Sequence, residues 1–272
     1  MPRRILKLIE THRPTILLAI PSMYAALLGA KSATREQFES LRFVVSGAEP
    51  LPRAVADGFE ERFGKRISEG YGLTETAPVT NLCLPSAYRP KSVGPPMPGI
   101  DEKVVDPEGK PLPRGSEGEI CIKGPNVMKG YLGLPEETTA VFDEAGYFRT
   151  GDMGRFDDDG HLYITGRIKE MLIIGGENVF PREIEEVLNA HPSVRASAVI
   201  GISDESRGEL PLAFVELEDG EAFDDRAVRS FCREQLAGYK VPREIRVLAE
   251  LPRNPTGKIL RRELSHDTKG SA

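Results

Sequence analysis

The chain contains no tryptophan, and aromatic residues make up only 7% of its 272 residues, a scarcity that by itself excludes no class of protein. It has only three cysteines, Cys83, Cys121 and Cys232, which show neither CxxC spacing nor an even count. A disulfide framework is therefore not expected, and a reducing, cytoplasmic location fits. An excess of positive charge is also lacking, because the formal net charge is −6. No electrostatic argument therefore supports nucleic acid as a partner.

No apolar run is long enough to span a membrane, although the N-terminal stretch imitates a secretory signal. "PRRILKLIE" supplies basic residues and "PTILLAIPSMYAALLGA" an apolar run. Against a signal, the polar stretch Glu10–Arg13 precedes the apolar run, and Pro21 divides it. We predict instead a helix over residues 2–12, a buried strand over residues 15–20, and a second helix opened by Pro21 and Ser22.

Three zones of different character follow one another along the chain. In residues 1–88, strand-like apolar runs alternate with helical patterns, which is typical of a parallel sheet flanked by helices. Residues 89–165 are rich in Pro and Gly, and the apolar runs between them indicate a β-rich subdomain of hairpins rather than disorder. Residues 166–272 alternate helices and strands again. The predicted fold class is therefore α/β and α+β, with a parallel-sheet lobe, a β-rich subdomain and a small C-terminal α+β domain.

Two glycine-containing turns follow predicted strands of the first zone, "SGAEP" at residues 46–50 and "GYGLTE" at 70–75. Ligands of parallel sheets bind beyond the carboxyl ends of the strands. In the second turn, the ring of Tyr71 is suited to stack on an adenine, the Thr74 hydroxyl to donate to a phosphate, and the Glu75 carboxylate to hold Mg²⁺. Each residue also has an ordinary interpretation as a core tyrosine, a strand-end hydroxyl and a solvated glutamate.

Further segments carry side chains suited to a nucleotide. Asp152 ends the turn in "FRTGD", where a carboxylate can accept hydrogen bonds from both hydroxyls of a ribose. Arg167 is a planar donor, and Lys169 follows at a junction between two zones, as a hinge residue would. Gly175–Gly176 permits close approach of backbone to a ligand. Lys258 stands on a loop from which an ammonium can neutralise developing charge. Taken in isolation, each is better explained as a turn, a strand connection or a solvated side chain.

The order of the motifs is far more specific than any one of them. "SGAEPLP", "GYGLTE", "GEICIKGPNVMKGY", "YFRTGD", "GRIKEMLIIGGENVFPREIE" and "PTGKILRREL" follow one another in the chain. In this order they resemble the adenylate-forming, or AMP-binding, superfamily of acyl-CoA synthetases, peptide-synthetase adenylation domains and luciferases. The resemblance covers nearly the whole chain, and "GGENVFPREIE" is most similar to fatty-acyl-CoA or aryl-CoA ligases. It implies that residues 1–88 are part of a nucleotide-binding core lobe and that residues 166–272 form a mobile domain.

The resemblance also implies a role for each candidate residue in turn. Around the nucleotide, it places Gly47, Ala48 and Glu49 along the adenine, Tyr71 on the other face with Gly72 in the same turn, Gly70 beside the acyl pocket, Thr74 at the α-phosphate, Glu75 on Mg²⁺, and Asp152 and Arg167 at the ribose. In the mobile domain, it assigns the hinge to Lys169, assistance of adenylation to Lys258, and the pantetheine channel to Gly175, Gly176 and Glu177.

The implied reaction has two steps. A carboxylic acid, fatty or aryl, attacks the α-phosphorus of Mg-ATP and gives an acyl-adenylate and pyrophosphate. The small domain then turns about Lys169, withdraws Lys258 and presents the glycine loop. A thiol, that of CoA or of a carrier protein, then displaces AMP. Positioning and charge neutralisation would drive the first step, and the domain motion would let one site serve both reactions.

One part of the family pattern is not found. The Ser/Thr/Gly-rich phosphate loop with its lysine has no counterpart in residues 1–70. We therefore expect the C-terminal portion of a synthetase, with an apolar face left uncovered on residues 1–88. Two hypotheses follow. The chain is an acyl-CoA ligase by itself, or it is a truncated or split product that needs an N-terminal synthetase fragment or a homo-oligomer, or that does no chemistry.

Overall fold

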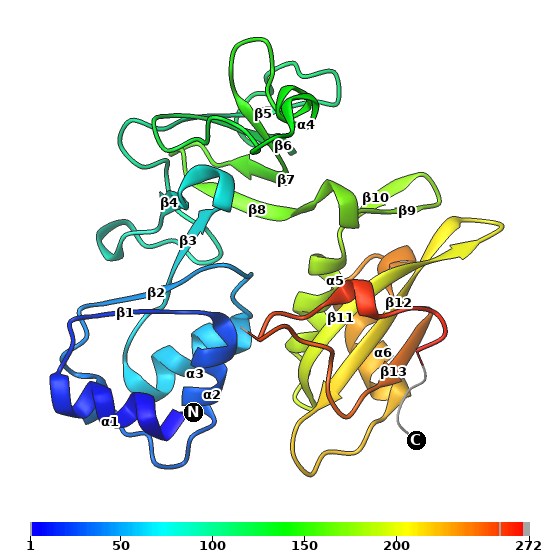
Figure 1. Cartoon of the computed structure of the whole chain (residues 1–272). Helices are drawn as coiled ribbons and strands as arrows, with labels where there is room; N and C mark the ends of the chain where they lie inside the picture. Colours follow the sequence, from blue (N-terminus) through cyan, green and yellow to red (C-terminus); the bar gives the residue numbers. More distant parts are fainter. Residues whose placement is uncertain (1, 256, 269–272) are drawn as a thin grey trace. The chain divides into compact units, whose positions relative to one another are not determined.

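The computed structural model describes residues 2–255 and 257–268 (Figure 1). The chain divides into two compact units, residues 1–165 and 166–272, and each is described by itself. In the described ranges, no helix combines the length and the apolar character that crossing a bilayer requires. The further division of the first unit at residue 88 stays a prediction.

The first unit begins with a four-stranded sheet in the order β1-β2-β3-β4. Its strands are β1 (Ile16–Ala19), β2 (Phe43–Ser46), β3 (Ser68–Gly72) and β4 (Val79–Leu82). The first three run parallel, and β4 is antiparallel to β3. The register pairs Ser46 with Glu69, so the turns that follow β2 and β3 start at the same edge of the sheet, as predicted.

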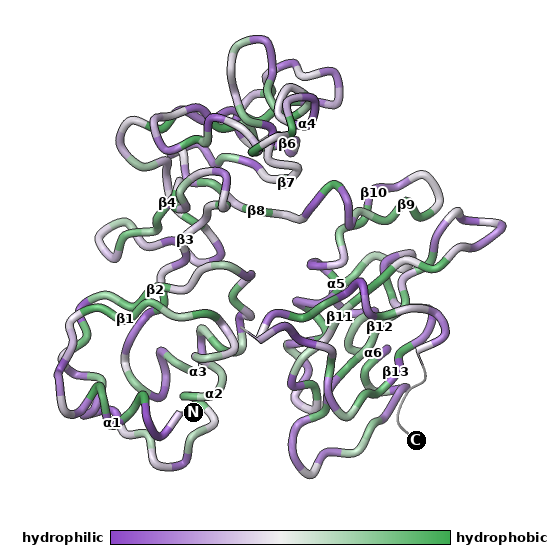
Figure 2. Tube along the Cα trace, viewed as in Figure 1, coloured by the Kyte–Doolittle hydropathy of each residue, from purple (hydrophilic) through white to green (hydrophobic). Residues whose placement is uncertain are grey.

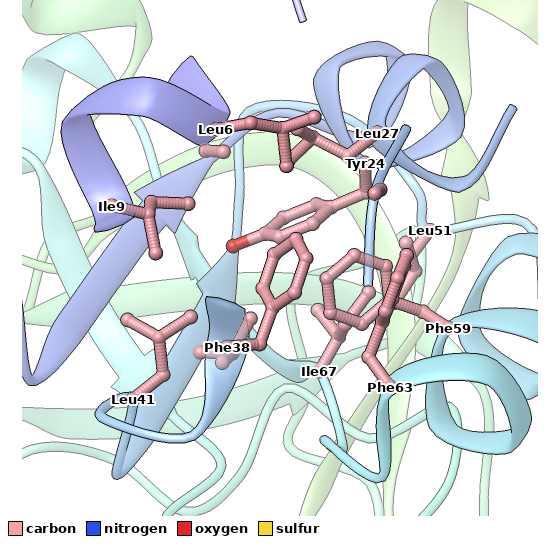
Figure 3. Close-up of a cluster of buried hydrophobic side chains, with 13 residues drawn as sticks. Leu6, Ile9, Tyr24, Leu27, Phe38, Leu41, Leu51, Phe59, Phe63 and Ile67 are labelled. Carbon is pink, nitrogen blue, oxygen red and sulfur yellow. The ribbon is translucent and has the colours of Figure 1, made fainter. Parts of the chain in front are cut away.

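Three helices pack on this sheet: α1 (Pro2–His12), α2 (Pro21–Leu28) and α3 (Arg53–Phe63). The helix predicted over residues 2–12 and the one predicted to open at Pro21 are confirmed. Helix α3 stops at Gly64, whose φ of +66° suits glycine and whose N–H donates to the Glu60 carbonyl at 2.8 Å. Figure 3 shows the core under the sheet, where Tyr24, Phe38, Phe59 and Phe63 lie among aliphatic side chains. Their rings meet mainly edge to face, with centroids 4.3–5.5 Å apart.

The strand predicted over residues 15–20 is present as β1, but the prediction that it is buried was wrong for two of its residues. Ile16 and Leu18 are 59% and 72% exposed, whereas Leu17 and Ala19 pack in the core. Successive side chains of a strand point to opposite faces, and only one face is covered by helices. Figure 2 shows the hydrophobic character of β1. Parallel sheets normally bury both faces, so Ile16 and Leu18 leave an apolar part of one face bare among the described residues.

A second sheet of the first unit, in the order β5-β6-β7-β8, matches the β-rich zone. Its strands are β5 (Asp101–Val105), β6 (Gly118–Lys123), β7 (Phe148–Phe156) and β8 (Leu162–Arg167), with the short helix α4 (Pro135–Ala140) between β6 and β7. Adjacent strands β5, β6 and β7 are antiparallel. Isolated bridges from Asn81 to Pro96 and from Gly94 to Leu162 join this sheet to the first one.

The second unit is built on a five-stranded sheet with two helices. The strands are β9 (Leu172–Ile174), β10 (Glu177–Val179), β11 (Val194–Asp204), β12 (Gly208–Leu217) and β13 (Glu244–Val247), and the helices are α5 (Pro181–Asn189) and α6 (Asp225–Gln235). Strand β12 pairs with β11, β13 and β9. Helix α6 starts at Asp224, whose carboxylate accepts from the Ala227 N–H at 3.0 Å. The three sheets together confirm the predicted fold class.

Candidate functional site

The two glycine motifs of the first unit lie against each other, although Gly70–Gly72 forms the end of β3, paired with β4, and not a turn as predicted. A Cβ built on Gly47 would lie 3.6 Å from the Gly70 carbonyl oxygen, so the backbones of the two motifs touch. Ala48 is exposed and has a φ of +71°, a conformation that few non-glycine residues adopt. The 46–50 turn is therefore sharply bent, and its backbone lies beside the backbone of residues 70–75.

Tyr71 joins motifs that lie far apart in the sequence. Its hydroxyl donates to Asp152 Oδ2 at 2.7 Å across 81 residues of chain. Asp152 is only 2% exposed. Burial, and then the neighbouring Asp152 carboxylate, raise the pKa of Tyr71 well above its ordinary value, so the phenol stays a donor. Part of the ring packs against the cluster of Val93, Val104, Ile120, Ile122 and Leu162. Tyr71 is thus a core residue as well as a candidate ligand residue.

The turn that carries Asp152 is held by groups that the sequence motifs did not reveal. Glu119 is 7% exposed, and its Oε1 accepts from the Gly151 N–H at 3.1 Å. Its Oε2 accepts from Arg149 Nε at 2.9 Å. Thr150 Oγ1 donates to the Ile120 carbonyl at 2.8 Å and accepts from the Asp152 N–H at 3.0 Å. The carboxylate of Asp152 is therefore presented by a preorganised turn.

Glu75 lies on the short 3₁₀ helix η2 (Thr74–Thr76), where it is half-buried while Thr74 is exposed. The Tyr131 hydroxyl donates to Glu75 Oε1 at 3.0 Å. Thr76 is fully buried, and its hydroxyl donates to the Pro78 carbonyl at 2.7 Å. Tyr131 ends the motif "GEICIKGPNVMKGY", so its position in that motif was the only signal in the sequence for this contact. The segment around Tyr131 and the buried Thr76 together fix the direction of the Glu75 carboxylate.

A single carboxylate suits Mg²⁺ here better than a metal that requires a protein cage. Within residues 2–255 and 257–268, no three His, Cys, Asp or Glu side chains gather to hold a metal ion. Mg²⁺ is commonly held by one or two carboxylates together with phosphate oxygens of a substrate. The half-buried Glu75 fits that donor set.

Gly72 is a glycine for a steric reason. A Cβ at this position would lie 1.7 Å from the Pro78 carbonyl oxygen and 2.6 Å from its carbon. Both atoms belong to backbone and have little freedom to yield. The close approach of residues 72 and 78 closes the loop that carries Thr74 and Glu75, so the glycine is required for the shape of the turn.

A second buried carboxyl group lies near the Tyr71 backbone. Glu102 Oε2 accepts from Asn81 Nδ2 at 2.9 Å, and its buried Oε1 has no hydrogen-bond partner. Burial raises the pKa of Glu102 from 4.5 to about 7, against the lowering effect of Asn81 and Thr80. Thr80 in turn contacts the Tyr71 carbonyl at 3.3 Å. The environment of β4 therefore holds a carboxyl that changes charge near neutral pH.

The candidates from residue 166 onward lie in the second unit. Arg167 is the last residue of β8, and Lys169 lies in the 3₁₀ helix η4 (Ile168–Glu170). Gly175 and Gly176 form the exposed turn between β9 and β10, with φ values of +62° and +88°. No atom lies within 4 Å of a Cβ built on either glycine, so backbone conformation and not crowding requires them. Glu177 follows as the first residue of β10 and is exposed.

Lys258, in the second unit, is held by two hydrogen bonds to Asn254. The side chain is exposed. The backbone N–H of Lys258 donates to Asn254 Oδ1, and the backbone carbonyl of Lys258 accepts from the Asn254 N–H, both at 2.8 Å. A bridge pairs Arg253 with Ile259, and Ile259 packs against the buried pair Leu251 and Leu264. Residues 253 and 254 therefore hold residues 258 and 259 by backbone and side-chain hydrogen bonds.

The structure thus brings together part of the predicted site. Tyr71 meets Asp152, and Gly47 meets Gly70, all within the first unit. Arg167, Lys169, the 175–177 turn and Lys258 belong to the second unit. Their convergence with Tyr71 and Asp152 on one adenosine stays a prediction.

Comparison with known proteins adds an independent line of evidence. Residues 1–132 match the model of the AMP-binding enzyme family, and residues 183–258 match that of the AMP-binding enzyme C-terminal domain. A long-chain-fatty-acid–CoA ligase of Bacillus subtilis is 41% identical over 97% of this chain and 47% of its own length. A feruloyl-CoA synthase of an Amycolatopsis species is 38% identical over 97% of this chain and 54% of its own. The chain spans about half the length of these curated relatives.

Solved structures of related enzymes also resemble this chain. The ATP-bound structure of MatB from Rhodopseudomonas palustris matches with a TM-score of 0.89 at 38% identity, covering 96% of this chain and 52% of MatB. The likeness runs through both described units, since the matched residues cover nearly all of the chain.

Proposed function

Because this chain belongs to the AMP-binding enzyme family and corresponds to the C-terminal portion of its acyl-CoA and aryl-CoA ligases, we propose that it takes part in the ATP-dependent ligation of a carboxylic acid to CoA. The observation that carries this proposal is the 2.7 Å hydrogen bond from Tyr71 to Asp152. This contact supports the proposal because it joins an aromatic ring and a carboxylate that 81 residues of chain separate. An adenosine needs that combination.

In the first step, this chain would bind and orient the nucleotide. The adenine lies between the ring of Tyr71 and the backbone of Gly47 to Glu49, with Gly70 and Gly72 shaping the turn. The ribose hydroxyls donate to Asp152, which requires Tyr71 to share or release this carboxylate, because Asp152 is nearly inaccessible. In this proposal, Arg167 would support the ribose.

The phosphates would be met by the exposed Thr74 and by Glu75. The Thr74 hydroxyl donates to an α-phosphate oxygen, and the Glu75 carboxylate, oriented by Tyr131, holds Mg²⁺. When bound, Mg²⁺ neutralises charge on the phosphate oxygens. Lys258 adds its ammonium where charge develops between the attacking carboxylate and the α-phosphorus. Its backbone hydrogen bonds to Asn254 limit the entropy lost when the side chain is positioned.

In the second step, the chain would present the 175–177 turn to the pantetheine arm of CoA after rotation about Lys169. The two glycines of this turn are exposed and lack side chains, so a thiol-bearing arm can pass close to the backbone. We propose a fatty or aryl acid as the acyl substrate, because the relatives named above include a long-chain-fatty-acid–CoA ligase and a feruloyl-CoA synthase.

The second candidate function is that residues 1–272 act only together with the N-terminal portion of such a ligase. Two observations favour it. The chain spans 47% and 54% of the two relatives. Ile16 and Leu18 also leave an apolar sheet face uncovered among the described residues. An exposed apolar sheet face of this kind is suited to pack against another layer of secondary structure.

ATP–pyrophosphate exchange with a panel of fatty and aryl acids separates the two candidates. Exchange by the purified chain alone, reduced at least about 100-fold in Lys258→Ala, supports the first. The matched control is Lys110→Ala, an exposed lysine in a surface turn of the first unit, which should keep full exchange. Exchange that appears only when an N-terminal ligase fragment is added supports the second. No exchange even then, with correct folding by circular dichroism, refutes both.

A further inference from the structure

Two buried carboxylates, Glu216 and Glu185, hold the Lys258 segment on either side of the lysine. Glu216 binds residues before it in the chain, and Glu185 binds an arginine after it. Glu216, 5% exposed, accepts from the Leu251 N–H at 2.6 Å and from Arg253 Nη2 at 3.2 Å. Glu185, 7% exposed, accepts from Arg261 Nη2 at 2.6 Å and Nε at 3.0 Å. The lysine is therefore flanked by two arginines, each anchored on a carboxylate of the second unit.

Arg261 makes one contact that Arg253 lacks. Its Nη1 donates to Glu170 Oε2 at 3.1 Å. Glu170 is the last residue of η4 and directly follows Lys169. Glu185, the other carboxylate that binds Arg261, also accepts from the Val199 N–H at 2.8 Å through its Oε1. The Glu185 carboxylate is therefore fixed to β11. One guanidinium thus connects the predicted hinge, the helix α5 and the lysine segment.

From these contacts, and resting on the function proposed above, we infer that Arg261 is a positioning residue that makes the hinge-side residue Glu170 and the Lys258 segment move as one rigid body. The planar fork of arginine can bind two carboxylates at fixed angles, which the single ammonium of lysine does not reproduce. The pivot of the domain motion then ends at Lys169, because the next residue, Glu170, is tied through Arg261 to the unit that carries Lys258.

The consequence for the reaction is a split between its two steps. Adenylation needs Lys258 held at a defined distance from the pivot, since a small displacement of a positioned group lowers the rate. Thioester formation proceeds after Lys258 has withdrawn. Loss of the Arg261 link should therefore slow adenylation and leave the second step nearly unchanged. A merely structural arginine would affect both steps alike.

The test uses two mild variants of the full chain and one matched control. Glu170→Ala removes the acceptor of the hinge contact while Arg261 stays paired with Glu185, and Arg261→Lys keeps a positive charge on the buried Glu185. Arg262→Ala changes the exposed neighbouring arginine and is the control. The first readout is hydrogen exchange of peptides covering residues 251–260, which depends on local opening and not on catalysis. We expect exchange to be about two- to fivefold faster in both variants and unchanged in the control.

The second readout compares the half-reactions, with any N-terminal fragment that exchange requires. We expect a similar two- to fivefold loss in ATP–pyrophosphate exchange and less than a twofold change in thioester formation from supplied acyl-adenylate. Unchanged hydrogen exchange in both variants overturns the inference, as does an equal loss in both half-reactions. If wild-type protein shows no adenylation under any condition, the proposed function fails, and hydrogen exchange alone decides whether Arg261 couples the segments.

Discussion

Replacing Glu102 by glutamine should remove a pH-dependent loss of stability from the first unit. An unfolded glutamate ionises near 4.5, whereas burial raises the pKa of Glu102 to about 7 in the folded protein. Between these pH values the folded state binds more protons than the unfolded state, so stability falls as pH rises. A change of one in pKa corresponds to about 1.4 kcal/mol, so the full loss reaches about 3 kcal/mol once pH exceeds 7.

Glutamine keeps the shape of the side chain and carries no charge at any pH. Its carbonyl oxygen can still accept from Asn81 Nδ2, the hydrogen bond of 2.9 Å that Glu102 makes now. The neighbouring Asp101, whose charge adds to the rise in the pKa of Glu102, is unchanged in the variant. Glu102→Gln should therefore match the wild type near pH 4.5 and exceed it by about 3 kcal/mol at pH 8.

Urea unfolding followed by tyrosine fluorescence is the suitable assay. Six of the seven tyrosines lie within residues 1–165, so the signal reports mainly on the first unit. Glu117→Gln is the matched control, because Glu117 is exposed in the same β-rich region. If the free energies of unfolding of the wild type and Glu102→Gln run parallel from pH 5 to pH 8, burial does not raise this pKa and the reasoning is refuted.

Two further predictions concern residues 70–75, which carry Tyr71 and Gly72. Gly72→Ala should destabilise the first unit by about 3 kcal/mol or more, because its Cβ would overlap the Pro78 carbonyl; urea unfolding measures this, and a loss under 1 kcal/mol would show that the loop adjusts. Tyr71→Phe should lower the free energy of unfolding by about 1.5–3 kcal/mol, because the buried Asp152 loses a donor. Nucleotide affinity, measured by calorimetry, should change less than about threefold if the ring supplies the stacking.

Local features were readable from the sequence because they depend on neighbours in the chain. The helix over residues 2–12 and the start of α2 at Pro21 follow from periodicity and cap residues. The order of the motifs was sufficient to indicate the family, and the family matches confirm it. These signals are carried by short stretches of sequence.

Other features were not readable, because they depend on which distant side chains share a buried space. Nothing near Glu119 in the chain shows that it supports the turn before Asp152. The apolar run over residues 15–20 predicted burial, yet only the face of β1 under the helices is covered. Arg261 sits in a basic segment next to Arg262, and only the fold gives one of them two carboxylate partners.

The amino-acid sequence alone therefore determined the fold class, the family and the list of candidate residues, since motifs and periodicity are local and persist along the chain. The tertiary structure alone decided that Tyr71 holds Asp152, that burial of the Glu102 carboxyl raises its pKa, and that Arg261 bridges Glu170 and Glu185. Each of these depends on burial and on atoms brought within hydrogen-bonding distance by the packing of separate elements, which no single stretch of the chain encodes.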